Sequence, residues 1–162
     1  MSNPASAAEA CRTVECGALQ LAGTRKHYDS EPWKTIPAQW MEFVPHVMKL
    51  ALNGEQVSYG LCFETGKGID YMCAVPVADD VALPPVFVRV QLPARKYAVI
   101  PHIAHVSELY KTIGKAFREV LPAAGLQPDH ADGHPGVIER YGPGFNPQTG
   151  FGDVEIWIPV KG

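Results

Sequence analysis

The chain has 162 residues, of which 46% are hydrophobic, so it is long enough to form one domain with a sizeable core. Its net charge is −3, from 14 basic and 17 acidic residues without a basic cluster, so we expect no direct contact with nucleic acid. No apolar stretch reaches the roughly 18 residues of a membrane helix and the N-terminus lacks a signal-peptide pattern, so we expect a cytoplasmic protein that does not associate with a membrane.

The first half of the chain is predicted to form a strand, a helix and a hairpin. Thr35 fits the N-cap of the helix and Pro37 its first turn, and apolar residues then recur at helical spacing. Pro45 should bend or end this helix, and Asn53-Gly54 should close it. The predicted ranges are 13–27 for the first strand, 36–51 for the helix, and 57–64 and 69–77 for the hairpin.

The second half repeats this order of elements. Its first strand is predicted to be long and bent, with a break at Pro93-Ala94. Ser107 should cap the helix that follows, and Pro122 and Gly125 should close it. The predicted ranges are 86–92 and 95–102 for the bent strand, and 137–141 and 153–159 for the last two strands.

The repeated order predicts an α+β fold built from a duplicated strand-helix-strand-strand unit. We expect a flexible tail at 1–12 and a single domain at 13–162, with pseudo-repeats at 13–77 and 86–160. In each half, one helix covers one face of the sheet and leaves the other face uncovered. Two such halves, packed side by side, would give antiparallel sheets, two main helices and a central ligand cleft.

The last strand carries the first candidate for a ligand site. Side chains alternate between the faces of a strand, so Glu155 and Trp157 share one face, and the other face is apolar. A carboxylate beside a large aromatic ring suits an aromatic or apolar cation, which the ring contacts and the carboxylate neutralises. The alternative is that both residues lie at the surface without a ligand.

No pattern in the sequence indicates a metal or a cofactor. The four cysteines contain no Cys-x-x-Cys pair, and no Gly-x-Gly-x-x-Gly or Gly-x-Ser-x-Gly motif occurs. The histidine pairs His102 and His105, and His130 and His134, lie in predicted turns and loops whose composition accounts for them. We therefore expect no cofactor, no metal and no serine-hydrolase site.

Several short motifs, in this order and spacing, resemble the GyrI-like effector-binding domains of AraC-type and MerR-type regulators, including stand-alone integron cassette proteins. The resemblance covers almost the whole chain from Thr13. The motifs that carry it are Ala22-Gly23, Trp40 with Phe43, Val57-Ser58-Tyr59-Gly60, Tyr71-Met72-Cys73-Ala74-Val75-Pro76-Val77, Leu92-Pro93-Ala94-Arg95-Lys96-Tyr97-Ala98-Val99, Pro101-His102 and Glu155-Ile156-Trp157-Ile158-Pro159.

The resemblance implies a cleft that binds hydrophobic, often cationic, small molecules. Glu155 matches the glutamate that supplies the counter-charge on the last strand of the family. The implied aromatic lining is Trp157, Tyr59, Tyr71, Tyr110 and Trp40, and for each of these a place in the core is the alternative.

Three classes of function follow from the resemblance. The first is a stand-alone binding protein for hydrophobic or cationic aromatic ligands, without room for a DNA-binding module before Thr13 or after Val160. The second is a hydrolase of strained-ring genotoxins that uses a cleft glutamate. The third is an interaction module that acts on a topoisomerase or a regulator, with a protein partner or a homodimer as possible assemblies. Enzymatic activity is left open, and we name no catalytic residue.

Overall fold

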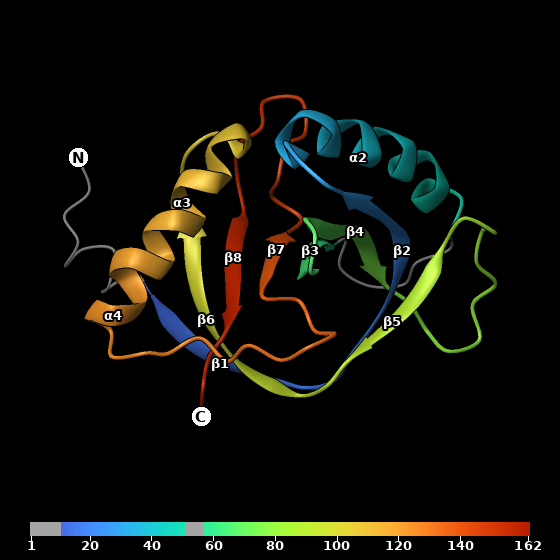
Figure 1. Cartoon of the computed structure of the whole chain (residues 1–162). Helices are drawn as coiled ribbons and strands as arrows, with labels where there is room; N and C mark the ends of the chain where they lie inside the picture. Colours follow the sequence, from blue (N-terminus) through green and yellow to red (C-terminus); the bar gives the residue numbers. More distant parts are fainter. Residues whose placement is uncertain (1–10, 51–56) are drawn as a thin grey trace.

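Eight strands form one antiparallel sheet in the computed structural model, which describes residues 11–50 and 57–162 (Figure 1). The sheet order is β1-β6-β8-β7-β3-β4-β2-β5. The strands are β1 (Arg12–Cys16), β2 (Leu19–Tyr28), β3 (Ser58–Glu64), β4 (Ile69–Pro76), β5 (Val88–Leu92), β6 (Arg95–His102), β7 (Val137–Tyr141) and β8 (Val154–Pro159). The α+β fold with two main helices is confirmed, as one continuous sheet.

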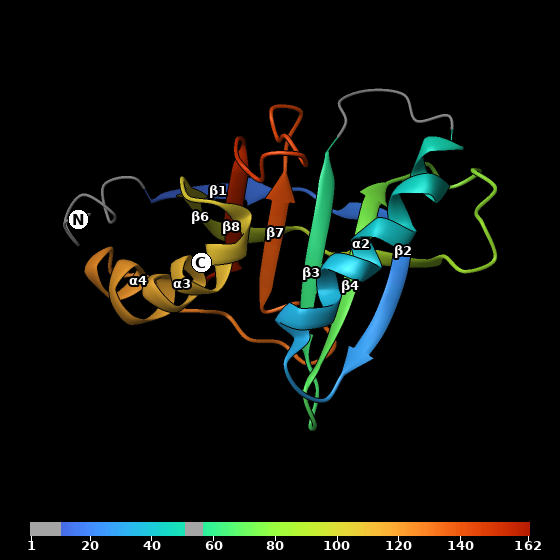
Figure 2. The same ribbon diagram turned by 90° about the horizontal axis from the view of Figure 1, so that it is seen from above.

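Both helical segments cover the same face of this sheet (Figures 1 and 2). Helix α2 (Pro32–Met48) packs over β2 and β4, where Phe43 joins a buried cluster with Tyr71 and Val75. The second helical segment packs against β6 and β8, and its parts are η1 (Val106–Glu108), α3 (Leu109–Lys115), the π-helical turn η2 (Ala116–Val120) and α4 (Leu121–Ala123). In the described ranges, no helix has the length and hydropathy needed to cross a membrane.

The order of the strands reads the same from either edge of the sheet. Each of the strands β1 to β4 has a counterpart four strands later in the chain, so that β1 corresponds to β5 and β4 to β8. When every strand is replaced by its counterpart and the order is read from the opposite edge, the same order results, and its midpoint lies between β3 and β7. Strand β1 precedes β2 in the chain but pairs with β6, and β5 precedes β6 but pairs with β2. How closely 13–77 and 86–160 superpose stays a prediction.

The prediction of one long bent strand at 86–102 is wrong, because these residues form two strands with different neighbours. Strand β5 pairs with β2, whereas β6 pairs with β1 and β8 at the far side of the sheet. Pro93 separates them, because proline lacks the N–H that a continuous ladder requires. The strand predicted for 13–27 is divided in the same way at Gly17-Ala18, between β1 and β2.

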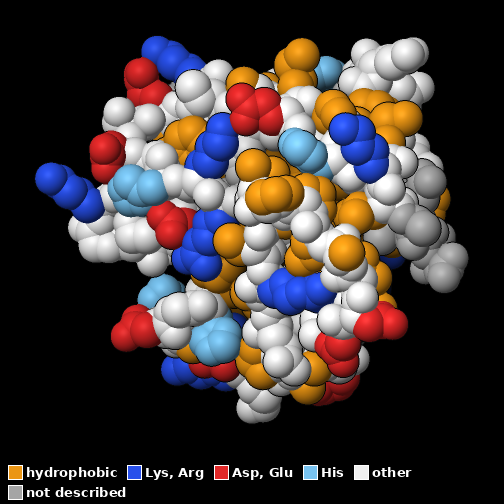
Figure 3. All heavy atoms as spheres, turned by 90° about the vertical axis from the view of Figure 1, so that its right-hand side faces the viewer, with side chains coloured by type: hydrophobic (Ala, Val, Ile, Leu, Met, Phe, Trp, Pro, Cys, Tyr) orange, Lys and Arg blue, Asp and Glu red, His pale blue; other side chains and the backbone are white. Residues whose placement is uncertain are grey.

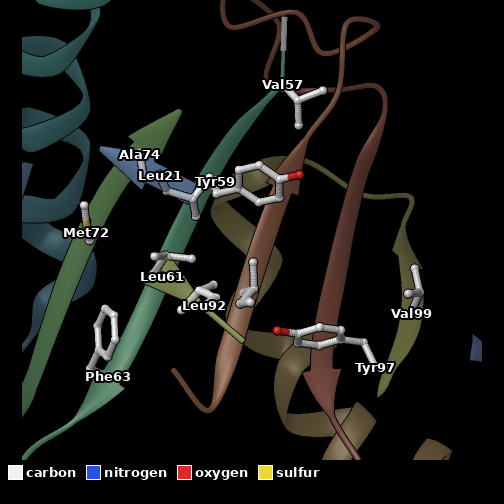
Figure 4. Close-up of a cluster of buried hydrophobic side chains, with 11 residues drawn as sticks. Leu21, Val57, Tyr59, Leu61, Phe63, Met72, Ala74, Leu92, Tyr97 and Val99 are labelled. Carbon is white, nitrogen blue, oxygen red and sulfur yellow. The ribbon is translucent and has the colours of Figure 1, made fainter. Parts of the chain in front are cut away.

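The sheet is rolled, and its other face encloses a large hydrophobic cluster (Figure 4). This cluster contains Leu61 of β3 and Met72 of β4 at the centre. Val14 of β1 and Leu92 of β5 belong to the same cluster, although they lie on opposite edge strands. The sheet must therefore curl until both edges approach each other, as Figure 1 shows.

Helix α2 begins earlier than predicted and continues past its second internal proline. Pro32 occupies the first turn and Glu31, with φ of 48°, is the N-cap, so Thr35 and Pro37 lie inside the helix. The helix does not end at Pro45, because it continues to Met48, and the predicted bend at this residue stays a prediction. Pro45 lies on the exposed side of the helix, where water can solvate the carbonyl group that proline leaves without a donor. The predicted stop at Asn53-Gly54 lies outside the described residues.

The second helical segment also differs from the prediction at its start. His105, not Ser107, is the N-cap, because its Nδ1 accepts a hydrogen bond from the backbone N–H of Ser107. The segment ends at Ala123, after Pro122, and Gly125 follows with φ of 70°. The predicted close of this helix is therefore confirmed.

Pro45, which is exposed in the interior of α2, should lower the stability of the protein. Pro45→Ala restores a backbone N–H and removes the clash of the ring with the carbonyl of residue 41, so it should raise the free energy of unfolding by about 1–2 kcal/mol. Pro32→Ala is the matched control and should give no gain, because proline is favourable in the first helical turn. Urea unfolding of the three proteins measures the difference, and equal effects of both substitutions would contradict the expectation.

Candidate functional site

A buried carboxylate lies on the helix-covered face at the centre of the sheet. Glu139 of β7 accepts a hydrogen bond from the hydroxyl of Tyr71 of β4 at 2.6 Å and another from the hydroxyl of Tyr141 of β7 at 2.7 Å. Trp40 of α2 donates its Nε1–H to the hydroxyl oxygen of Tyr71 at 3.0 Å. The four residues come from both halves of the chain and form one hydrogen-bonded group, which we call the Glu139 site.

Gly60 makes the Glu139 site possible. It lies on β3 between the two partners and is paired in register with Glu139. A Cβ atom at this position would lie 2.1 Å from the hydroxyl oxygen of Tyr71 and 2.6 Å from Oε1 of Glu139. The ring of Tyr71 therefore reaches the carboxylate across the backbone of β3 only because residue 60 has no side chain.

Helix α2 is held in place beside the site by a buried amide. Gln39 is 1% exposed, and its Nε2 donates to the backbone oxygens of Thr24 at 2.9 Å and Tyr71 at 3.0 Å. Its Oε1 accepts from the hydroxyl of Tyr28 at 2.7 Å. These contacts fix the turn of the helix that carries Trp40 relative to β2 and β4.

Aromatic rings surround the carboxylate. Trp40 packs edge-to-face against Tyr141, with ring centroids 5.4 Å apart, and against Tyr71 at 6.4 Å. Phe145, in the loop after β7, packs on Tyr141 at 5.0 Å. Tyr71 is 1% exposed, whereas Trp40, Glu139 and Tyr141 keep part of their surface accessible. Tyr71 therefore forms the buried part of the site, and the other three side chains are partly accessible.

The electrostatics of the site favour a cation. Burial raises the pKa of Glu139 against the opposing effect of the two tyrosine hydrogen bonds. Burial and the nearby carboxylate hold the pKa of Tyr71 and of Tyr141 well above the ordinary value. No basic residue in the described part of the chain forms an ion pair with Glu139. A buried carboxylate without a counter-ion gains most from a cationic ligand.

The structure brings Glu155, Trp157 and Tyr59 together on the opposite face of the sheet. Glu155 is 15% exposed in its side chain and forms ion pairs with Arg12 at 2.7 Å and Arg140 at 3.4 Å. Trp157 donates its Nε1–H to Glu155 at 3.2 Å, and Tyr59 belongs to the cluster inside the roll. These residues do not contact the Glu139 site, and their ligand roles stay predictions.

The other three predicted residues lie on the helical side. Tyr71 and Trp40 are part of the Glu139 site, as described above. Tyr110 lies on α3 and is 64% exposed, with Nζ of Lys111 5.9 Å from the centre of its ring. It makes no described contact with Glu139 or with the rings around it.

Glu139 and Tyr141 were not predicted from the sequence. The same alternation that singled out Glu155 and Trp157 also places Glu139 and Tyr141 on one face of their strand. The adjacent Arg140 gives the segment the appearance of a charged surface strand, but its side chain points to the opposite face, where it meets Glu155. Among the described residues, no three His, Cys, Asp or Glu side chains are grouped closely enough to hold a metal ion.

The fold and the site together define an α+β domain that binds small molecules. A family model described as GyrI-like small molecule binding domain matches residues 10–161, so the chain belongs to this family. The resemblance found in the sequence is thereby confirmed.

Individual relatives agree with this assignment. The transcriptional regulator BrlR of Pseudomonas aeruginosa is 27% identical over 151 residues, which cover 92% of this chain but only 54% of the regulator, so the chain spans about half of that relative. The structure of SAV2435 bound to tetraphenylphosphonium has a TM-score of 0.67 at 20% identity and covers 94% of both chains. An integron cassette protein of Vibrio cholerae has a TM-score of 0.63 at 15% identity, with 94% of this chain and 97% of that chain covered. Both structures show the same fold.

A methyl group at residue 60 should disrupt the Glu139 site. Gly60→Ala forces Tyr71 and the carboxylate apart and should lower the free energy of unfolding by about 1–3 kcal/mol. Gly17→Ala is the control, since no atom lies within 4 Å of its added methyl group, and it should be close to neutral. Chemical unfolding tests both, and a neutral Gly60→Ala would contradict the described packing.

The buried carboxylate should make stability depend on pH in a specific direction. The pKa of Glu139 is raised from the ordinary value of 4.5, so the folded state binds more protons than the unfolded state just above that pH, and stability falls as pH rises through this window. Glu139→Gln removes this term, so its Tm relative to wild type should increase from acidic to neutral pH. Glu155→Gln should instead lower the Tm at neutral pH, because Arg12 and Arg140 lose their partner. Thermal unfolding across pH distinguishes the two.

Proposed function

We propose that the protein binds hydrophobic cations, and that Glu139 supplies the counter-charge. The observation that carries the proposal is a buried carboxylate without an ion-pair partner among the described residues, beside the rings of Trp40 and Tyr141. A cation gains both from the negative charge and from the faces of the aromatic rings, and both contributions increase when water is excluded.

The comparison with known proteins supports the chemistry of the ligand. Tetraphenylphosphonium, the molecule bound to SAV2435, is a cation covered by four phenyl groups, and SAV2435 shares the fold of this chain. BrlR is a transcriptional regulator, and this chain corresponds to about half of it. We therefore propose that the bound molecule acts as an effector, as in the ligand-binding part of a regulator.

Glu155 is less suited to this role than Glu139. Its carboxylate already has Arg12 and Arg140 as partners, together with the indole N–H of Trp157. A cationic ligand would have to compete with two arginines for the same oxygens. At the Glu139 site it would meet only neutral donors.

Hydrolysis of a strained ring is the second candidate function, and the same carboxylate supports it. A largely buried carboxyl group with a raised pKa is a suitable general base for the activation of water. Turnover of a cyclopropane-containing substrate by the wild type, together with its loss in Glu139→Gln without loss of substrate binding, would assign this activity.

An interaction with another protein is the third candidate. Large hydrophobic side chains remain exposed on the outer side of the molecule, on α2 and beside β5 (Figure 3). They are Met41, Val44, Met48, Val86 and Val88. Charged and hydrophobic side chains are mixed on the face that Figure 3 shows. The observation is therefore weaker than that for the Glu139 site, and the ligand-binding function comes first.

Removing the charge of Glu139 and of Glu155 in turn should show which of the two carboxylates contacts the cationic ligand. Glu139→Gln should weaken the binding of tetraphenylphosphonium by about ten- to a hundredfold, or about 1.4–2.8 kcal/mol, because the size of the side chain is kept and only the charge is lost. A neutral aromatic such as triphenylmethanol should bind wild type and variant almost equally. Isothermal titration calorimetry measures both.

Glu155→Gln is the matched control for this experiment. It makes the same chemical change on the other face of the sheet and should leave tetraphenylphosphonium binding unchanged. If Glu155→Gln weakens binding and Glu139→Gln does not, the ligand lies on the opposite face, and the assignment from the sequence is the better one. Equal loss of cationic and neutral ligands would indicate damage to the site.

A further inference from the structure

The two oxygens of the Glu139 carboxylate have different surroundings. Both tyrosine hydroxyls donate to Oε1, from Tyr71 at 2.6 Å and from Tyr141 at 2.7 Å. No donor among the described residues reaches Oε2. Every fully buried side-chain N or O atom in the described part of the chain has a hydrogen-bond partner, so Oε2, which has none, keeps some solvent-accessible surface.

The tyrosine protons cannot readily turn towards a ligand. Tyr71 accepts the Nε1–H of Trp40 at 3.0 Å, and this fixes its oxygen between the indole and the carboxylate and directs its proton at Oε1. The absence of a side chain at Gly60 leaves the space that the ring of Tyr71 occupies in this position. Tyr141 packs against the rings of both Trp40 and Phe145. Both tyrosine hydroxyl groups therefore already donate to Oε1, and the group that remains for a ligand is the acceptor Oε2.

We infer that the Glu139 site selects hydrophobic cations that carry an N–H group, such as protonated amines and amidines, over permanently charged cations of the same shape. An N–H aimed at Oε2 forms a charge-assisted hydrogen bond, which is shorter and about twice as strong as a neutral one. A quaternary ammonium or a phosphonium ion brings the same charge but no proton, so it leaves the acceptor Oε2 without a partner after water is displaced. The inference rests on the proposed binding of cations at this site.

The aromatic rings add to the affinity for both kinds of cation and leave the selection to the hydrogen bond at Oε2. The rings of Trp40 and Tyr141 lie beside the carboxylate with an interplanar angle of 74°, which gives the N-substituents apolar surface close to the acceptor. Cation–π attraction is similar for a protonated amine and for its methylated form, whereas the hydrogen bond exists only for the first. A matched pair of ligands therefore isolates the contribution of Oε2.

The test compares three ligands that share one ring system. The first is (1-naphthylmethyl)dimethylammonium, with one N–H, the second its trimethylammonium derivative, and the third the neutral 1-isobutylnaphthalene. At about pH 7 the tertiary amine is protonated, because alkylamines titrate well above this pH. The first ligand should bind the whole chain about tenfold more tightly than the second, as expected for one charge-assisted hydrogen bond.

Two variants show whether the preference arises at Oε2. Glu139→Gln replaces the carboxylate by an amide that also carries donors, and it should reduce the tenfold preference to about twofold or less. Glu155→Gln should leave the preference unchanged. Equal or tighter binding of the trimethylammonium ligand by the wild type would overturn the selection for N–H donors but leave cation binding intact. Equal binding of all three ligands would overturn the proposed function itself.

Discussion

The pairing of β3 with β7 at the centre of the sheet is the constraint on which the site and much of the fold depend. Its register sets Gly60 opposite Glu139, and this lets Tyr71 of the first half reach a carboxylate of the second half. A shift of one residue would move Glu139 to the face that encloses the hydrophobic cluster and bring Arg140 under the helices. The many buried apolar residues on both faces oppose such a shift, so packing of the core fixes the chemistry of the site.

The elements were largely predictable from the sequence, because alternation and helical spacing are local. Strand β7 and the hairpin of β3 and β4 lie where the pattern placed them, to within a residue. The exchange of β1 and β5 was not predictable, because the choice of a strand's neighbour depends on contacts far apart in the chain. The start of α2 was missed because Glu31, in the left-handed region, is an unusual cap, and Thr35 fitted the ordinary preference.

The candidate site also depends on contacts between distant residues, which local sequence patterns do not predict. Tyr71 and Trp40 were named through the family motifs, whereas the sequence singled out Glu155 of β8 and did not single out Glu139 of β7. Alternation says which residues share a face of one strand, and it does not say which face the helices cover. Arginines on β1 and β7 then make the difference: Glu155 meets Arg12 and Arg140, and Glu139 meets only tyrosines. A sheet that presents a neutralised glutamate on one face and an uncompensated one on the other gives up stability at the second. Such a local cost is typical of functional sites.

The exchanged edge strands make the two halves of the chain interdependent. Strand β1 is separated from its partner β6 by about half of the chain, and β5 completes the sheet of the half that precedes it. Neither half closes its own sheet, so a fragment that contains only one of them would leave unpaired strand edges. Pairings between distant residues also slow folding, since each requires the closure of a long loop. The Glu139 site, with Trp40 and Tyr71 from one half and Glu139 and Tyr141 from the other, can therefore form only when the two halves have come together. A ligand bound there stabilises the joined halves and not either one alone.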